Sequence, residues 1–177
     1  MSRAQANVAL PLCLTPAGAG LGVARPWGHA ERAAPRTLYL AEPPAQYLVR
    51  PALVLDCSVL SAVLFSEPSR DEALQRMAGH ALNAPSLLDY EVASVAVKKL
   101  AQGWLLDSVG EAVQRYQQQG IALHAIKLRE QCALAQQYSL SAYDAAYLWL
   151  AAELKAPLAT FDAKLAKAAQ RHLSQLQ

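Results

Sequence analysis

From residue 51 onward, short apolar runs alternate with longer stretches in which apolar residues recur at helical spacing. The run 52–55 is apolar throughout, which is typical of a strand buried on both faces of a sheet. The stretch 86–102 carries an apolar stripe of helical period, and Gly103 behind it is a common helix terminator. The predicted strands are 52–55, 82–84, 121–125 and 157–161, and the predicted helices are 58–66, 69–79, 86–102, 107–119, 127–138, 141–155 and 162–173.

Strands that are separated by helices lie side by side in a parallel sheet, because the chain must cross back over the sheet before each new strand. The crossover helices then cover both faces. We therefore predict an α/β fold, a three-layer sandwich with a central parallel sheet of four strands, or five if a further edge strand exists. An apolar fraction of 54% with 17% charged residues is ample for such a core and excludes global disorder.

The first fifty residues differ in composition from the rest. They hold six of the ten prolines and five arginines against two glutamates, a net charge of +3, whereas the remainder carries a net charge of −1. Prolines at this density interrupt both helices and strands. We expect residues 1–50 to be an unstructured leader and residues 51–177 to form one domain.

Two other hypotheses concern this leader. The uncharged stretch 4–24 loosely resembles a secretory signal, but prolines and glycines interrupt it, so no membrane-spanning helix is expected. Met1 and Met77 are the only methionines, and Val and Leu codons can start bacterial translation, so the natural chain could begin near Leu48 or Val49. Three cysteines without CxxC spacing imply neither a disulfide framework nor a zinc cluster, and the cytoplasm is the expected compartment.

Four acidic residues occupy positions that share one edge of the predicted sheet. Asp56 ends the first strand, and Glu91 lies in the second turn of the helix after the second strand. Asp144 lies in the first turn of a helix that runs opposite to the strand after it, and Asp162 follows the fourth strand. Open α/β sheets bind ligands in the crevice at the carboxyl ends of their strands. We therefore expect the four carboxylates to meet there.

Such a cluster of carboxylates requires compensation. Two carboxylates ~4 Å apart repel by ~4 kcal/mol at an effective dielectric constant of ~20. Helix N-termini offset part of this repulsion, and protonation or a cation must offset the rest. Oxygen ligands with open positions suit Mg²⁺, or Mn²⁺, either of which activates water beside a phosphodiester. The four acids thus indicate hydrolysis of a nucleic-acid backbone.

Each acid also has a purely structural interpretation. Asp144 lies three residues after Ser141, at the spacing of a capping box, and Asp162 could be a simple N-cap. Asp89 lies three residues after Ser86, and we assign it to helix capping rather than to the site. The joint placement of the other acids at one edge is what favours a functional role.

Four strings of the chain form a recognisable series, namely ALVLDCSVLSAVLFSE (52–67), APSLLDYEVASVAVKKL (84–100), LSAYDAAYLWLAAEL (140–154) and APLATFDAKLAKAA (156–169). In this order and at this separation they resemble the PIN domain, and most closely the VapC-type ribonuclease toxins of bacterial toxin–antitoxin pairs. The resemblance implies a Mg²⁺- or Mn²⁺-dependent endoribonuclease that cleaves RNA, forms a homodimer and is inhibited by a cognate antitoxin protein. The residues that match the family's acids and hydroxyls are Asp56, Glu91, Asp144, Asp162, Ser58 and Thr160.

Under this resemblance the four acids are the catalytic and metal-binding residues, and the hydroxyls of Ser58 and Thr160 orient carboxylates. Many members of the family carry a final edge strand, which is not expected after Leu173. A non-catalytic PIN-like module that binds RNA or protein is the alternative. A phosphatase of the haloacid-dehalogenase type is set aside, because Ser58 stands where that chemistry requires a second Asp.

Basic and aromatic residues near the acids allow weaker predictions. The residues that could contact an RNA backbone are Lys164, Lys167, Arg171 and, more weakly, Lys98 and Lys99. A solvated helix face explains these basic residues more simply. Tyr143 and Tyr147 could stack on bases, but packing in the core or a dimer interface is the simpler interpretation. Cys57 has no His or metal partner for catalysis in the sequence, so we interpret it as a small buried residue.

Overall fold

The computed structural model of the protein describes residues 50–176. The predicted unstructured leader, the secretory-type stretch and the alternative start near residue 48 lie outside the described residues, so they stay predictions. Within the described range, every strand and helix expected from the sequence is present.

The elements begin and end within a few residues of the predicted bounds. The strands are β1 (Ala52–Leu55), β2 (Ala81–Pro85), β3 (Ala122–His124) and β4 (Leu158–Ala159). The helices are α1 (Cys57–Leu64), α2 (Arg70–Met77), α3 (Leu88–Ala101), α4 (Leu106–Gln118), α5 (Leu128–Tyr138), α6 (Ala142–Glu153) and α7 (Ala163–Leu173). Among the strands, β4 differs most from its predicted bounds, with two residues instead of five; it begins after Pro157, which has no N–H to give to a neighbouring strand.

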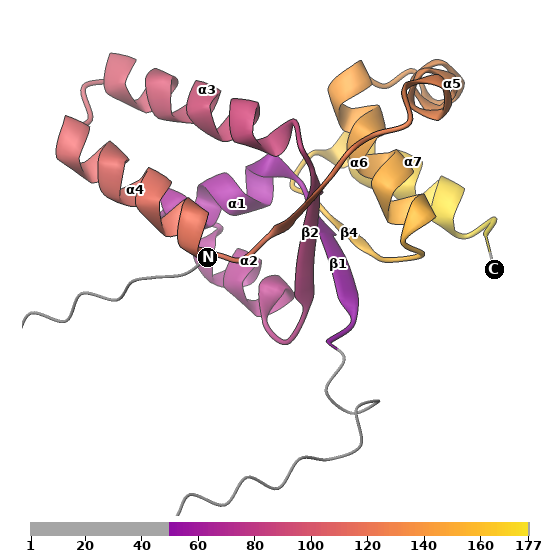
Figure 1. Cartoon of the computed structure of the whole chain (residues 1–177), viewed down its shortest axis with the longest axis horizontal. Coiled ribbons are helices and arrows are strands. Elements are labelled where there is room, and N and C mark those ends of the chain that lie inside the picture. Colours follow the sequence, from indigo (N-terminus) through magenta and orange to yellow (C-terminus); the bar gives the residue numbers. More distant parts are fainter. Residues whose placement is uncertain (1–49, 177) are drawn as a thin grey trace, which may run out of the picture. The chain divides into compact units, whose positions relative to one another are not determined.

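The four strands form one parallel sheet in the order β3–β2–β1–β4. Helices α1 to α4 lie on one side of this sheet and α5 to α7 on the other (Figure 1), so the predicted three-layer sandwich with four strands is confirmed. From β1 the chain adds β2 and β3 on one side and later returns to add β4 on the other. The order of the strands therefore reverses between β1 and β4, which is where open α/β sheets form their binding crevice.

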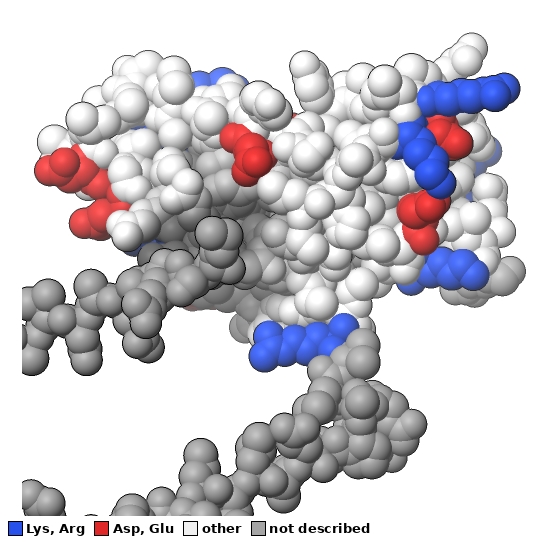
Figure 2. Space-filling view, viewed as in Figure 1, with Lys and Arg blue, Asp and Glu red and all other residues white. Residues whose placement is uncertain are grey.

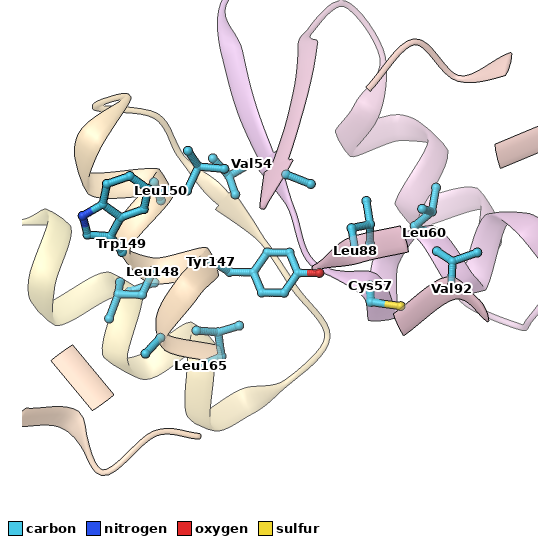
Figure 3. Packing of buried hydrophobic residues seen from close by; sticks show 14 of the residues in the cluster. Val54, Cys57, Leu60, Leu88, Val92, Tyr147, Leu148, Trp149, Leu150 and Leu165 are labelled. Carbon is cyan, nitrogen blue, oxygen red and sulfur yellow. The ribbon is translucent and has the colours of Figure 1, made fainter. Parts of the chain in front are cut away.

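The central strand β1 is buried on both of its faces, as its continuous apolar sequence predicts. Leu53 and Leu55 pack with Met77 and other residues of α1 and α2, whereas Val54 packs in the larger cluster with Leu150 of α6 (Figure 3). Each fully buried side chain of this size contributes about 1.5–3 kcal/mol. This packing holds the end of β1, and hence the residue that follows it, in a rigid position.

Between residues 50 and 176 no helix combines the length and the apolar character that a lipid bilayer demands of a crossing segment. Because the four strands are parallel, their carboxyl ends lie at one edge of the sheet, and Asp56 and Asp162 follow two of these ends.

Candidate active site

Asp56 follows β1 and is the N-cap of α1, with only 8% of its surface exposed. Its Oδ2 atom accepts hydrogen bonds from the hydroxyl of Ser58 at 2.5 Å and from that of Thr160 at 2.9 Å. The backbone N–H of Ser58 donates to the same oxygen at 3.3 Å. Because Thr160 follows β4, these bonds join the ends of two neighbouring strands through one carboxylate oxygen.

The loop after β4 is tied to the same point. The N–H of Asp162 donates to the Thr160 hydroxyl at 2.9 Å, and the N–H of Phe161 donates to the Ser58 hydroxyl at 3.0 Å. Asp162 therefore reaches Asp56 through a single hydroxyl group, and the two acids lie at the same edge of the sheet. We name Asp56, Ser58, Thr160 and Asp162 the strand-end cluster.

Asp162 also caps a helix, as its structural interpretation predicted, and Asp144 lies three residues after the Ser141 cap of another. Asp162 accepts a hydrogen bond from the N–H of Leu165 at 2.7 Å at the start of α7. Ser141 accepts one from the N–H of Asp144 at 3.0 Å at the start of α6. Capping fixes the backbone of each acid at a helix N-terminus, where the free N–H groups favour negative charge.

Glu91 is held by a residue of a different helix. Its Oε2 atom accepts a short hydrogen bond from the hydroxyl of Tyr147 in α6. Tyr147 is 1% exposed, and its ring reaches from α6 toward Leu88 and Cys57 (Figure 3). The packing interpretation of Tyr147 is therefore confirmed, and base stacking by this residue is wrong because its ring is enclosed by the core.

The charges of the acids act on one another. Burial raises the pKa of Glu91 above its ordinary value, the hydrogen bond from Tyr147 opposes this rise, and the negative charges of Asp56 and Asp144 add to it. Asp56 and Asp144 thus both lie within electrostatic range of Glu91. We name Glu91, Asp144 and Tyr147 the groove cluster.

A groove with a volume of about 680 Å³ opens beside Glu91. Its walls come from α3, from the first turn of α6 and from the start of α1. The lining residues are Cys57, Leu87, Tyr90, Glu91, Ser94, Val95, Lys98 and Tyr143. Tyr90 and Ser94 were not among the predicted site residues, although their spacing from Lys98, eight and four residues respectively, places all three on one helical face.

Cys57 forms part of this groove but is not a reactive thiol. Burial raises its pKa to about 11, and its sulfur lies 3.7 Å from the hydroxyl of Ser61. The thiolate is the nucleophilic form of cysteine, so this side chain is inert near neutral pH. The prediction of a small buried residue is confirmed.

Asp89 does not cap α3, and the assignment made from its spacing is wrong. The N-cap of α3 is Leu87, which makes no side-chain capping bond. Asp89 instead accepts a hydrogen bond from the hydroxyl of Tyr116 in α4 at 2.6 Å. The chain leaves β2 through Pro85 and a turn, so α3 begins too late for Ser86 to cap it, and the exposed carboxylate pairs with the neighbouring helix.

The predicted basic contacts divide between two places. Lys164, Lys167 and Arg171 line a separate depression of about 300 Å³ at the end of α5, where the Lys164 ammonium donates to the carbonyl of Ser139. Lys98, which was the weaker prediction, lines the groove itself. On the face shown in Figure 2, Lys and Arg alternate with Asp and Glu at one end instead of forming a broad basic patch.

Lys99 points away from the groove. Its ammonium pairs with Glu67 at 2.8 Å and lies 5.3 Å from the ring centroids of both Phe65 and Trp104. These contacts account for its charge within the fold, and they separate it from Lys98, its neighbour in the sequence.

The carboxylates supply the oxygen ligands of a Mg²⁺ or Mn²⁺ site. The charges of Asp56 and Asp144 help to raise the pKa of Glu91, and a bound cation would offset this repulsion. Among residues 50–176, no three His, Cys, Asp or Glu side chains stand close enough together to ligate an ion in their present positions. The acids therefore fit a divalent cation by chemistry and by charge, and their side chains would have to turn toward it.

Comparison with known proteins defines the class. The PIN domain family matches residues 53–171, and the chain belongs to this family. Among solved structures, the crystal structure of PAE2754 from Pyrobaculum aerophilum resembles the chain with a TM-score of 0.51 and 19% identity, covering 72% of this chain and 90% of that one. This likeness concerns the fold. No curated protein matches the chain. PIN domains are generally nucleases, typically with divalent metals, so membership supports a nuclease-type function.

Proposed function

We propose that the protein is a Mg²⁺- or Mn²⁺-dependent endoribonuclease of the VapC type, the toxin of a toxin–antitoxin pair. The observation that carries the proposal is the electrostatic coupling of Asp56, Glu91 and Asp144, three acids from separate segments, in a domain of the PIN family. A divalent cation stabilises an arrangement in which a carboxylate is repelled by two others.

The four acids would hold the ion, which when bound lowers the pKa of a water and offsets the charge of the phosphodiester. The hydroxyls of Ser58 and Thr160 keep the Asp56 carboxylate in one orientation. Tyr147 orients Glu91, which accepts a proton from the attacking water. The oxygen of water bonds to phosphorus, the bond to the 3′ oxygen breaks, and the leaving 3′ oxygen takes a proton from solvent, so the products are a 5′-phosphate and a 3′-hydroxyl.

The proposal includes an RNA substrate, a cognate antitoxin protein, a homodimer and a cytoplasmic location. The α3–α4 hairpin supports a protein partner, because Val97, Leu105 and Leu106 are 64%, 74% and 72% exposed. Apolar side chains that are exposed together on a small domain are typical of an interaction surface.

A non-catalytic PIN-like module that binds RNA or protein is the second candidate. The observation that favours it is the separation of the acidic side chains, no three of which stand at ligand distance in residues 50–176. Cleavage of RNA by the purified protein distinguishes the two candidates.

The test is cleavage of total RNA and of defined oligonucleotides with Mg²⁺ or Mn²⁺, with and without a chelator. Asp56→Asn and Asp144→Asn are each expected to reduce the rate about a thousandfold, since they remove several kcal/mol of transition-state stabilisation. Asp107→Asn, at an exposed acid of α4, is the matched control and should cleave like the wild type. Cleavage that persists in the presence of the chelator, or that both site variants still carry out, contradicts the enzyme proposal. The absence of cleavage under every condition favours the binding module.

A further inference from the structure

Strand β4 forms an outer edge of the sheet, because among the described strands it pairs with β1 alone (Figure 1). Backbone N–H groups at β1 donate at 3.0 Å to the carbonyls of Pro157 and Ala159, so these two residues direct their backbone groups toward β1. Successive residues of a strand direct these groups to opposite sides. Leu158 therefore turns its N–H and its C=O outward, and neither group has a hydrogen-bond partner among residues 50–176.

This edge is open to pairing with another backbone. Folded proteins commonly protect an edge strand with charged side chains, or with a proline whose missing N–H faces outward. The segment 157–161 contains no charged residue, and Pro157 faces β1, so its missing N–H lies on the inner side. The short length of β4, two residues, limits further pairing to one pair of bonds centred on Leu158.

A depression lies beside β4 on each face of the sheet. On the α7 side it has a volume of about 320 Å³, and the residues of α7 that line it are Ala166, Ala169, Gln170 and Leu173. On the α2 side it has a volume of about 400 Å³, and the residues that line it from α2 and the loop after it are Glu72, Ala73, Arg76 and His80. A strand laid along β4 sends its alternate side chains into the two depressions in turn.

The two depressions differ in chemistry. The α7 side presents alanine and leucine, and Leu158 packs there against the cluster that contains Ala169. The α2 side presents a cation, because Arg76 forms no ion pair with an acid of residues 50–176. Arg76 lies at the end of α2, directly before β2 begins, and so toward the amino ends of the strands. The first depression suits an apolar side chain, and the second suits an acidic one.

The hollow shape of this edge favours an extended peptide over a second copy of the chain. Two copies paired through β4 would be related by a two-fold axis, so each depression would lie opposite its own counterpart. Hollow surfaces that face each other leave both unfilled. A single extended segment fills both depressions, because its side chains alternate between the faces of the sheet.

We propose that the β4 edge binds an extended segment of a partner protein, which joins the sheet antiparallel to β4 as a fifth strand. An apolar residue of this segment exchanges both backbone hydrogen bonds with Leu158 and places its side chain in the α7-side depression. The next residue is acidic and faces Arg76. This surface lies on elements other than the α3–α4 hairpin, and the inference does not depend on the proposed nuclease function.

The experiment measures binding of a labelled peptide of about eight residues to the full chain by fluorescence anisotropy. The peptide has valine at its centre, aspartate directly after it, and threonine elsewhere, because β-branched residues favour the extended conformation. N-methylation of the valine amide removes the donor to the Leu158 carbonyl and should weaken binding at least about tenfold. N-methylation of the aspartate amide, which faces away from β4, is the matched control and should stay within about twofold of the parent peptide.

Variants of the protein test each depression separately. Ala166→Trp fills the α7-side depression and should weaken binding at least about tenfold, whereas Ala133→Trp, at an exposed alanine of α5, should not. Arg76→Ala should weaken binding about twofold to fivefold, as expected for an exposed ion pair, and Arg129→Ala of α5 is its control.

Hydrogen exchange of the backbone amides locates the bound peptide. The N–H of Leu158 faces outward and should exchange at least about tenfold more slowly when the peptide is bound. Ala159 faces β1, so its exchange rate should be the same with and without peptide. This pair of neighbouring residues distinguishes pairing at the edge from binding elsewhere on the protein.

No binding of the parent peptide at concentrations up to about 1 mM overturns the inference, and so does an equal loss of affinity for the two methylated peptides. A full chain that self-associates in sedimentation, and loses self-association in Ala166→Trp, has a second copy at this edge, which also overturns it. Cleavage of RNA is measured separately. Its presence or absence leaves these outcomes unchanged, so failure of the proposed function and failure of this inference are distinguishable.

Discussion

The strand-end cluster and the groove cluster lie at one edge of the sheet, yet they are built differently. In the strand-end cluster, Asp56 is buried and receives hydrogen bonds from Ser58 and Thr160 on a single oxygen. In the groove cluster, Glu91 has one hydroxyl partner, and the charges of two other acids act against its ionised form. The first cluster is stabilised by its own bonds, and the second retains uncompensated repulsion.

This difference shows which half of the site depends on a ligand. A carboxylate held by several hydroxyl and N–H donors keeps its orientation without outside help. A half-buried carboxylate beside two like charges gains stability when a cation or a proton arrives. The strand-end cluster therefore serves as the fixed part of the candidate site, and the groove cluster as the part that responds to metal and to pH.

The largest effect should come from breaking the fixed half. Thr160→Val removes the hydroxyl that donates to Asp56 and accepts from the N–H of Asp162, so metal affinity or cleavage should fall about tenfold to a hundredfold. Thr160→Ser keeps the hydroxyl and should stay close to the wild type. The measurement is the initial cleavage rate across a Mg²⁺ titration. An unchanged titration for Thr160→Val means that Asp56 does not depend on these bonds.

A smaller effect is expected from the single hydroxyl that supports the groove cluster. Tyr147→Phe removes the donor to Glu91 and should lower the free energy of unfolding by about 1–2 kcal/mol, since Glu91 is only half-buried and water can replace part of the bond. Tyr90→Phe removes an exposed hydroxyl that has no hydrogen-bond partner within residues 50–176, and it should stay within about 0.5 kcal/mol of the wild type. Denaturant unfolding compares the two. Equal values for both variants would show that the Tyr147 bond does not stabilise the fold.

The smallest effect is a difference in pH dependence. The pKa of Glu91 is raised above its ordinary 4.5 in the folded protein, so at mildly acidic pH the folded state binds more protons than the unfolded chain. The contribution of Glu91 to stability is therefore present at low pH and is lost as pH rises through the raised pKa.

Glu91→Gln lacks this titrating carboxyl group. Its free energy of unfolding should therefore increase relative to that of the wild type as pH rises through this range. Asp144→Asn removes one of the repelling charges and should make the wild-type slope shallower. Denaturant unfolding at a series of pH values measures both. Parallel curves for the wild type and Glu91→Gln are the result that contradicts the raised pKa.

Much of this molecule could be predicted without coordinates, for local reasons. The apolar run of β1 spans the observed residues Ala52–Leu55, because a central strand of a parallel sheet must be apolar on both faces. Asp56 and Asp162 were expected at the same edge because each directly follows a parallel strand, and a short loop cannot carry them far. The capping roles of Asp162 and Ser141 likewise follow from spacing within one turn of helix.

Other features depend on segments that are distant in the chain, and their spacing in the sequence carried no signal. The bond between Tyr147 and Glu91 spans 56 positions and exists because the fold brings these residues of α6 and α3 within hydrogen-bond distance. The bond between Tyr116 and Asp89 spans 27 positions and arises from the pairing of α3 with α4, which overrode the capping pattern.

The sequence alone determined the strands, the parallel sheet and the edge at which the acids lie, because these follow from periodicity and chain direction. Only the tertiary structure decided which acid receives several hydrogen bonds, which one is repelled by its neighbours, and that Tyr90 and Tyr143 line one groove. Those properties depend on burial and on distances between side chains of packed helices, and no local pattern encodes them.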